Sequence, residues 1–101
     1  NGRNITAIFA SNDDMAAGIY AAAAERGVRI PDDISVAGYD DSAVAELVWP
    51  QLTTVRQPVA DMAAEAVRIL INTPCDGEIS IAGMPYELVI RDSVARIPGC
   101  N

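Results

Sequence analysis

The sequence contains no histidine and no lysine, so all of its basic side chains are seven arginines. Without an imidazole, the chain cannot form a Ser–His or Cys–His pair, and it has no histidine ligand for a metal. Without a lysine amine, it has neither a Schiff-base residue nor the lysine of a phosphate-binding loop. An active site in this chain would therefore have to use carboxylates alone.

Positive charge and cysteine are also scarce. The formal net charge is −7, and a field of this sign repels a phosphate backbone, so direct nucleic-acid binding by this chain is disfavoured. Cys75 and Cys100 lie late in the sequence without metal-ligand spacing, so we expect no disulfide framework, metal site or cofactor. No apolar run reaches the ~20 residues that span a bilayer, and no signal sequence opens the chain, so we expect a soluble protein.

The residues that are present favour a packed α/β fold. Hydrophobic residues make up 50% of the 101 residues, enough for one domain or part of one. "ITAIFA" (5–10) is typical of a strand, "SNDD" (11–14) of a helix start, and an alanine-rich helix follows until Gly27. "ISVAG" (34–38) returns as a second strand, so the sequence predicts a βαβ unit in a parallel sheet.

Polar residues follow the carboxyl ends of both predicted strands, "SNDD" after the first and "GYDD" (38–41) after the second. These two segments should share one rim of the sheet, where parallel sheets bind ligands. Asn12 either caps the helix or contacts a polar ligand, and the cap is the favoured role. Asp40 either accepts hydrogen bonds from a small ligand or caps a turn, and capping is the role we favour for Asp41.

Two enzymatic interpretations of these carboxylates are disfavoured. Adjacent residues of an extended strand project to opposite sides, so Asp40 and Asp41 do not form a two-carboxylate glycosidase pair unless the chain turns between them. Asp40 could instead be a phosphoacceptor, as in response regulators. That class uses a lysine on a later strand, which this sequence does not contain.

The remaining elements follow the same local signals. After Asp41 we expect a connector with one helical turn, a third strand over 52–57, and an amphipathic helix that begins at Pro58. Its apolar face is explained by core packing. An irregular loop over 72–85 and a strand over 86–94 complete the chain, and we place the aromatic residues Tyr20 and Trp49 at an interface.

Three segments, "AIFASNDDMAAG", "RIPDDISVAGYDD" and "WPQLTTVRQP", occur in the order and spacing of the LacI/GalR family of bacterial transcription regulators, which the chain resembles from Ile5 to about Val94. The resemblance implies part of a periplasmic-binding-protein-like (type I) fold, in which two α/β lobes bind a small molecule between them. It assigns residues 1–57 mainly to the C-terminal lobe, 58–84 to a helix and loop of the N-terminal lobe, and 85–101 to the C-terminal lobe again. The family's DNA-binding headpiece is absent from this stretch.

The resemblance also implies roles for individual residues. Asn12, Asp40 and Gln57 are the expected ligand contacts, and the expected dimer-interface residues are Tyr20, Ala21, Leu47, Val48 and Trp49. We therefore expect the sensing part of a cytoplasmic LacI-type regulator, not an enzyme, that binds a sugar or related metabolite and forms a homodimer or larger assembly. Operator DNA would be bound only through the headpiece. A periplasmic sugar-binding protein of an uptake system is the alternative.

Overall fold

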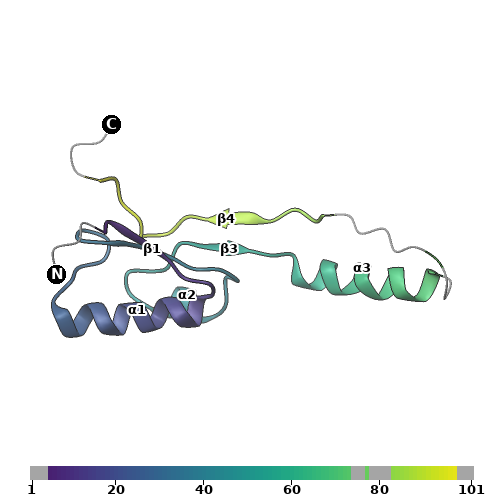
Figure 1. The fold of residues 1–101 in the computed structure, drawn as a ribbon, viewed down its shortest axis with the longest axis horizontal. Coiled ribbons are helices and arrows are strands. Elements are labelled where there is room, and N and C mark those ends of the chain that lie inside the picture. Colours follow the sequence, from purple (N-terminus) through teal and green to yellow (C-terminus); the bar gives the residue numbers. More distant parts are fainter. Residues whose placement is uncertain (1–4, 74–76, 78–82, 98–101) are drawn as a thin grey trace. The chain divides into compact units, whose positions relative to one another are not determined.

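The computed structural model describes residues 5–73, 77 and 83–97. Its elements in chain order are β1 (Ala7–Phe9), α1 (Asp13–Arg26), β2 (Ser35–Ala37), α2 (Val44–Leu47), β3 (Thr54–Arg56), α3 (Val59–Asn72) and β4 (Glu87–Val89) (Figure 1). The chain forms two compact units: the first comprises the residues up to Arg56 and from Glu87 onward, and the second comprises Gln57–Tyr86. None of the described helices is long and apolar enough to cross a membrane.

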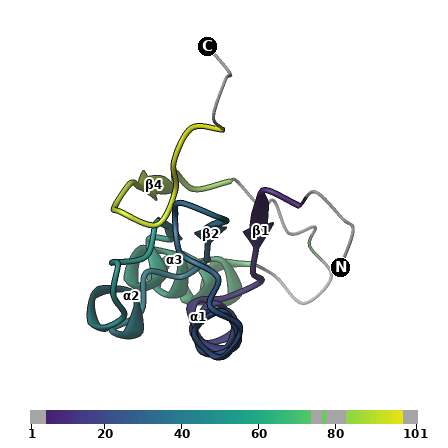
Figure 2. The same cartoon turned by 90° about the vertical axis from the view of Figure 1, so that its left-hand side faces the viewer.

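The parallel sheet that the sequence predicts is present in the first unit. β1 pairs with β2 in parallel, with Ile8 opposite Val36, and Ala37 forms a further parallel bridge to Thr53. The helix α1 lies along one face of the β1–β2 pair (Figure 2). The prediction of a βαβ unit is therefore confirmed.

The predicted third and fourth strands are found, but they are shorter and pair in a way that the sequence did not reveal. β3 and β4 are antiparallel, with Val55 opposite Leu88, and each has 3 residues. The ladder is short because its neighbours bond elsewhere: Leu52 donates to the carbonyl of Ala45 at 2.9 Å. The backbone N–H of Arg91 donates to Thr53 Oγ1, also at 2.9 Å.

The helix α1 begins and ends where its sequence predicts. Asn12 is the N-cap, and its Oδ1 accepts a hydrogen bond from the backbone N–H of Met15 at 2.8 Å. Gly27 ends the helix with a φ of 69°, a left-handed conformation that costs glycine little. The cap fixes the first turn of α1 directly after β1, and so places the predicted site residues at the end of that strand.

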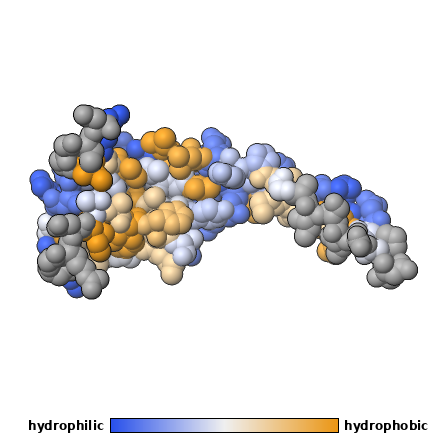
Figure 3. Space-filling view, turned by 45° about the horizontal axis from the view of Figure 1, so that its top comes forward, coloured by the Kyte–Doolittle hydropathy of each residue, from blue (hydrophilic) through white to orange (hydrophobic). Residues whose placement is uncertain are grey.

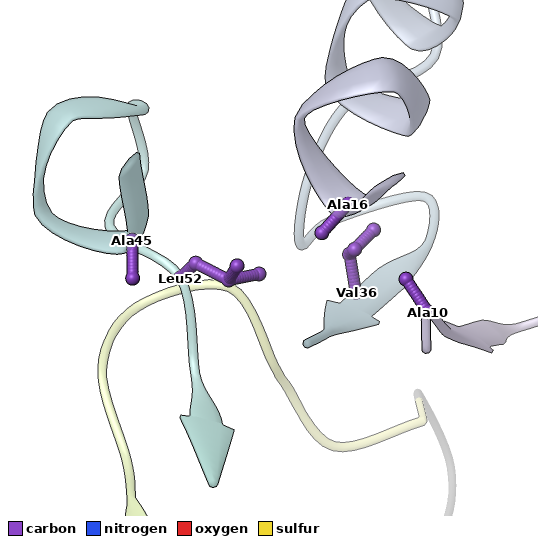
Figure 4. Packing of buried hydrophobic residues seen from close by; sticks show 5 residues of the cluster. All are labelled: Ala10, Ala16, Val36, Ala45 and Leu52. Carbon is purple, nitrogen blue, oxygen red and sulfur yellow. The ribbon is translucent and has the colours of Figure 1, made fainter. Parts of the chain in front are cut away.

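The core of the first unit is small and rich in alanine. Its buried members are Ala10, Ala16, Val36, Ala45 and Leu52 (Figure 4). The alanines allow α1 and α2 to approach the strands closely, since a methyl side chain adds little bulk. Ile19, Tyr20, Ile30, Ile34 and Val48 are partly buried around this core. Their packing holds α1 and the segment after α2 against the sheet.

The second unit is built on α3, which has the amphipathic pattern that the sequence predicts. Thr73 ends the helix, and its Oγ1 donates to the carbonyl of Ile69 at 2.6 Å. Core packing was expected to account for the apolar face, but none of the helix's own residues is buried within the chain. Its large apolar side chains are exposed, and they include Val59, Met62, Val67, Leu70 and Ile71. The first unit also has exposed apolar residues, which Figure 3 shows in orange.

Candidate functional site

The two polar segments that follow β1 and β2 meet at the carboxyl ends of these strands. The backbone N–H of Asp13 donates to the carbonyl of Tyr39 at 3.1 Å. Directly after β1, the N–H of Ala10 donates to the carbonyl of Ala37 at 2.8 Å. This hydrogen bond continues the strand pairing up to the rim. The structure therefore brings the segments that carry Asn12 and Asp40 side by side, as the parallel topology predicts.

The buried side chain of Asp13 holds this rim together through hydrogen bonds. Its side chain is buried, with 1% of the residue exposed, and Oδ1 accepts a hydrogen bond from Thr54 Oγ1 at 2.6 Å. Its Oδ2 accepts hydrogen bonds from the backbone N–H of Ser42 at 2.7 Å and from Ser42 Oγ at 3.2 Å. One carboxylate thus joins three elements: the helix α1, the strand β3 and the loop that follows β2. Its hydrogen-bond partners offset the cost of burying a charge.

The sequence did not single out Asp13, which lies in the segment "SNDD" that is typical of a helix start. A signal for the buried position of Asp13 is present in the sequence, at Gly38. The loop needs a glycine there to leave room for the side chain of Asp13. A Cβ at Gly38 would overlap Asp13 Oδ1 and would lie 2.9 Å from Leu52 Cδ2. The glycine of "GYDD" is therefore required by close packing at a position where its φ is not left-handed.

The chain turns sharply at the two adjacent aspartates. Asp40 has a φ of 115° and Asp41 a φ of 56°. Residues other than glycine rarely adopt such positive φ values. The N–H of Asp40 donates to the carbonyl of Val55 at 2.8 Å, which ties the turn to β3. The backbone of Asp40 is therefore fixed, while the residue as a whole is exposed to solvent at the rim.

Asp41 does not cap the following turn, which corrects the role that we favoured for it. The short helix α2 has Ala43 at its N-cap and no side-chain cap. Instead, Asp41 Oδ2 accepts from Arg56 Nε at 2.7 Å, and Asp41 Oδ1 accepts from an Arg91 Nη at 2.7 Å. Two guanidinium groups satisfy a carboxylate better than one exposed backbone N–H would, since both partners are charged.

The ion pairs set the charge state of Asp41. Burial on its own would raise the pKa of this carboxyl group, but the hydrogen bonds from Arg56 and then Arg91 outweigh that effect. The pKa of Asp41 is therefore lowered from its ordinary value, and the group is charged at neutral pH. The same contact raises the pKa of Arg56.

Asn12 and Gln57 complete the predicted ligand contacts. The helix cap uses one lone pair of the side-chain oxygen of Asn12, so a ligand contact by this residue would use its amide nitrogen or the second lone pair of that oxygen. Gln57 lies in the second unit, directly after β3, and its backbone carbonyl accepts from the N–H of Val59 at 2.9 Å. The ligand-contact roles of Asn12, Asp40 and Gln57 stay predictions.

The residues predicted at a dimer interface differ in burial. Leu47 and Trp49 are 79% and 81% exposed, and Ala21 is exposed on α1. Tyr20 and Val48 instead pack against the core, and Tyr20 Oη donates to the carbonyl of Pro50 at 2.6 Å. Burial raises the pKa of the Tyr20 phenol, so it stays a donor over the ordinary pH range. Tyr20 thus fixes the segment that presents Trp49.

An apolar hollow lies away from the rim, toward the C-terminal end of α1. Its walls include Ile8, Ala23 and Ile34, with Arg26 and Asp33 also in its lining. The hollow does not involve the loop after β2. Among the residues that the structure describes, no group of three or more His, Cys, Asp and Glu side chains is placed to hold a metal ion. The rim remains the candidate site.

A family match decides how this geometry should be interpreted. Residues 3–94 match the family model of the periplasmic binding protein-like domain. The chain belongs to that family. Its parallel βαβ unit and the polar rim at the carboxyl ends of β1 and β2 are therefore parts of a periplasmic-binding-protein-like fold, as the sequence predicts.

Individual relatives show which proteins of this family the chain is similar to. The chain is 43% identical to the transcriptional regulator MalR of Streptomyces coelicolor over 97% of this chain and 29% of that protein. It is also 43% identical to the transcriptional repressor PurR of Vibrio vulnificus, over 91% of this chain and 28% of the relative. The chain therefore spans less than a third of the length of these curated relatives.

A solved structure agrees with these relatives. The LacI family transcriptional regulator from Enterococcus faecium, with bound ribose, superposes with a TM-score of 0.76 and 34% identity. The match covers 91% of this chain and 35% of that one. The resemblance to the LacI/GalR family that the three sequence segments predict is confirmed.

Proposed function

We propose that this chain is the effector-sensing part of a LacI-type transcription regulator. The observation that carries the proposal is the placement of Asp40, whose backbone is fixed to β3 and whose surface is exposed beside the segment that bears Asn12. A carboxylate in such a position accepts hydrogen bonds from neighbouring hydroxyl groups, as a sugar would supply. The ribose bound to the E. faecium regulator supports a sugar or a related polar metabolite as the effector.

The activity that we propose is binding without chemical turnover. Asp40 and Asn12 contact the effector from the first unit, and the family resemblance adds Gln57 at the start of the second. Binding changes operator affinity only if the effector prefers one arrangement of the protein over another, because equal affinity for both shifts nothing. The operator itself is contacted by a DNA-binding headpiece outside this chain, in a cytoplasmic protein.

The proposed assembly is a homodimer. Its interface comprises Tyr20, Ala21, Leu47, Val48 and Trp49, and the large exposed fractions of Leu47 and Trp49 support it. Apolar side chains that stand out from the surface in this way favour burial against a partner. A role as the periplasmic sugar-binding protein of an uptake system has less support, because MalR, PurR and the E. faecium protein are transcription regulators.

The test is sugar binding by the full-length protein and its Asp40→Ala variant. Isothermal titration with D-ribose and a panel of other mono- and disaccharides should identify a ligand, and Asp40→Ala should lose most of the affinity for it. Asp32→Ala is the control, since Asp32 is exposed on the segment before β2, away from the rim. If no sugar in the panel binds, or if Asp40→Ala binds with an unchanged Kd, the proposal is wrong.

A further inference from the structure

The carboxylate of Asp41 bridges two arginines, one on β3 and one in the segment that follows β4. Arg56 is the last residue of β3, and Arg91 lies two residues after the end of β4. Both ion pairs have N–O distances of 2.7 Å, and the side chains of Asp41 and Arg91 are only 8% and 12% exposed. The Arg91 pair is shielded from water on both sides, so salt weakens it less than a surface pair, whereas the Arg56 side chain is 49% exposed.

These two strands are the described segments by which the chain leaves and re-enters the first unit. Arg56 directly precedes Gln57, where the second unit begins, and β4 starts directly after Tyr86, where that unit ends. Arg56 also pairs with Glu87 across the ladder, with an N–O distance of 3.3 Å. A change in either strand therefore acts on an ion-pair network that includes Asp41.

Arg91 is held firmly enough to transmit such a change. One of its Nη atoms donates to the carbonyl of Leu52 at 2.9 Å, and its backbone N–H donates to Thr53 Oγ1 at the same distance. Its other Nη lies 3.8 Å from Glu46 Oε1, on the short helix α2. The guanidinium group is therefore fixed by the backbone as well as by Asp41.

The same loop carries Asp40, one residue before Asp41. The left-handed φ values at both positions are costly for aspartate and persist only where the surroundings hold them. Those surroundings are the Val55 carbonyl, which accepts from Asp40, and the two arginines on Asp41. These three anchoring groups belong to β3 or follow β4, so a movement of these strands would reorient Asp40.

We infer that the two aspartates have separate roles: Asp40 contacts the effector, and Asp41 is a positioning residue that couples this contact to the strands leading to and from the second unit. This inference rests on the proposed function. It answers why the loop needs two adjacent carboxylates, since one carboxylate cannot both bind a ligand and satisfy two arginines.

The test uses Asp41→Asn in the full-length protein, with D-ribose or the sugar that the panel identifies as the probe. Effector coupling in allosteric proteins is typically about 5- to 150-fold, measured here as the ratio of operator Kd values with and without sugar. We expect Asp41→Asn to bring this ratio to within about twofold of one, while the sugar Kd changes far less than in Asp40→Ala. Asp41→Glu, which keeps the charge, should restore part of the coupling.

Two further variants keep the test decisive. Asp92→Asn is the matched control, because Asp92 is exposed and adjacent to Arg91, and it should leave coupling unchanged. Arg56→Gln removes the more exposed of the two ion pairs of Asp41, together with the Arg56–Glu87 pair, and should reduce coupling even if Asp41→Asn folds poorly. An unchanged ratio in a folded Asp41→Asn protein, or a loss of sugar affinity equal to that of Asp40→Ala, would overturn the inference.

A measurement without ligand separates this inference from the proposed function. Hydrogen exchange should show faster exchange of the Asp40 and Asp41 amides in Asp41→Asn than in Asp92→Asn, because the loop has lost its two charged anchors. If no sugar binds and this exchange difference is present, the proposed function fails while Asp41 keeps its positioning role. If the two variants exchange alike, the positioning role fails whatever the ligand proves to be.

Discussion

Asp13 Oδ1 accepts a hydrogen bond of 2.6 Å from Thr54 Oγ1, which lies 41 residues later in the chain. Both residues are buried, so neither group can replace the other with water at low cost. The pair joins the first turn of α1 to β3. It is the contact through which a residue next to Asn12 fixes the strand that holds Asp40.

Replacing Thr54 by valine should destabilise the protein by about 1–3 kcal/mol, because Asp13 loses its shortest hydrogen bond while the volume stays nearly the same. Urea unfolding monitored by circular dichroism measures the effect. Thr6→Val is the control, since Thr6 is exposed, and its effect should stay within about 0.5 kcal/mol. Equal effects of the two substitutions would show that the buried hydroxyl contributes nothing specific.

Gly38→Ala should also destabilise, by about 1–3 kcal/mol, since the added methyl group overlaps Asp13 Oδ1 and crowds Leu52. Gly18→Ala provides the matched comparison within α1. A Cβ there meets nothing within 4 Å, so this substitution should stabilise the helix by up to about 1 kcal/mol. Urea midpoints that move in opposite directions confirm the prediction. A neutral Gly38→Ala contradicts it.

The stabilising contribution of Asp41 should disappear in acid. Its pKa is lowered in the folded protein, so the contribution is present above the unfolded value of about 3.9 and is lost as pH falls through the folded pKa. The groups that face it are Arg56 and Arg91, with Glu46 and Glu87 beyond them.

The measurement is the difference in unfolding free energy between the wild-type protein and Asp41→Asn, followed from pH 7 to acid. This difference should be largest near neutral pH and should shrink below about pH 4. Because both proteins share every other carboxyl group, the subtraction isolates Asp41. A difference that stays constant with pH would mean that the asparagine acts through shape and not through charge.

The dimer proposal predicts that Trp49→Asp shifts the full-length protein to monomer. Burying a charge in place of an indole that is 81% exposed in this chain opposes association. Sedimentation velocity across a concentration series measures the shift. Asn72→Asp adds the same charge at an exposed position of α3 and should leave the sedimentation profile unchanged. A dimeric Trp49→Asp protein would place the interface elsewhere.

The elements that the sequence predicts correctly are those that local signals determine. Asn12 and Gly27 mark the ends of α1 because caps act within one turn, and the βαβ order allows only one common handedness. The antiparallel β3–β4 ladder was missed because its partners are far apart in the sequence, with Arg56 opposite Glu87. Their residue patterns predict strands but not which strands pair.

The candidate site shows the same division. The positions of Asn12 and Asp40 on one rim follow from parallel topology alone. The partners of Asp41 do not, since Arg56 and Arg91 lie 15 and 50 residues away. Asp13 was missed for a related reason: a carboxylate at a helix N-terminus already has a sufficient local explanation, so nothing in the sequence indicates that it is also buried.

The helices α1 and α3 have the same length, 14 residues, but they differ in what holds them. α1 buries Asp13, Ala16 and Ala23, whereas none of the residues of α3 is buried within this chain. A helix of this length is marginal in water unless another surface covers its apolar side. In this chain, α3 should therefore open and close locally without the first unit unfolding, and its amides should exchange long before those of α1 do.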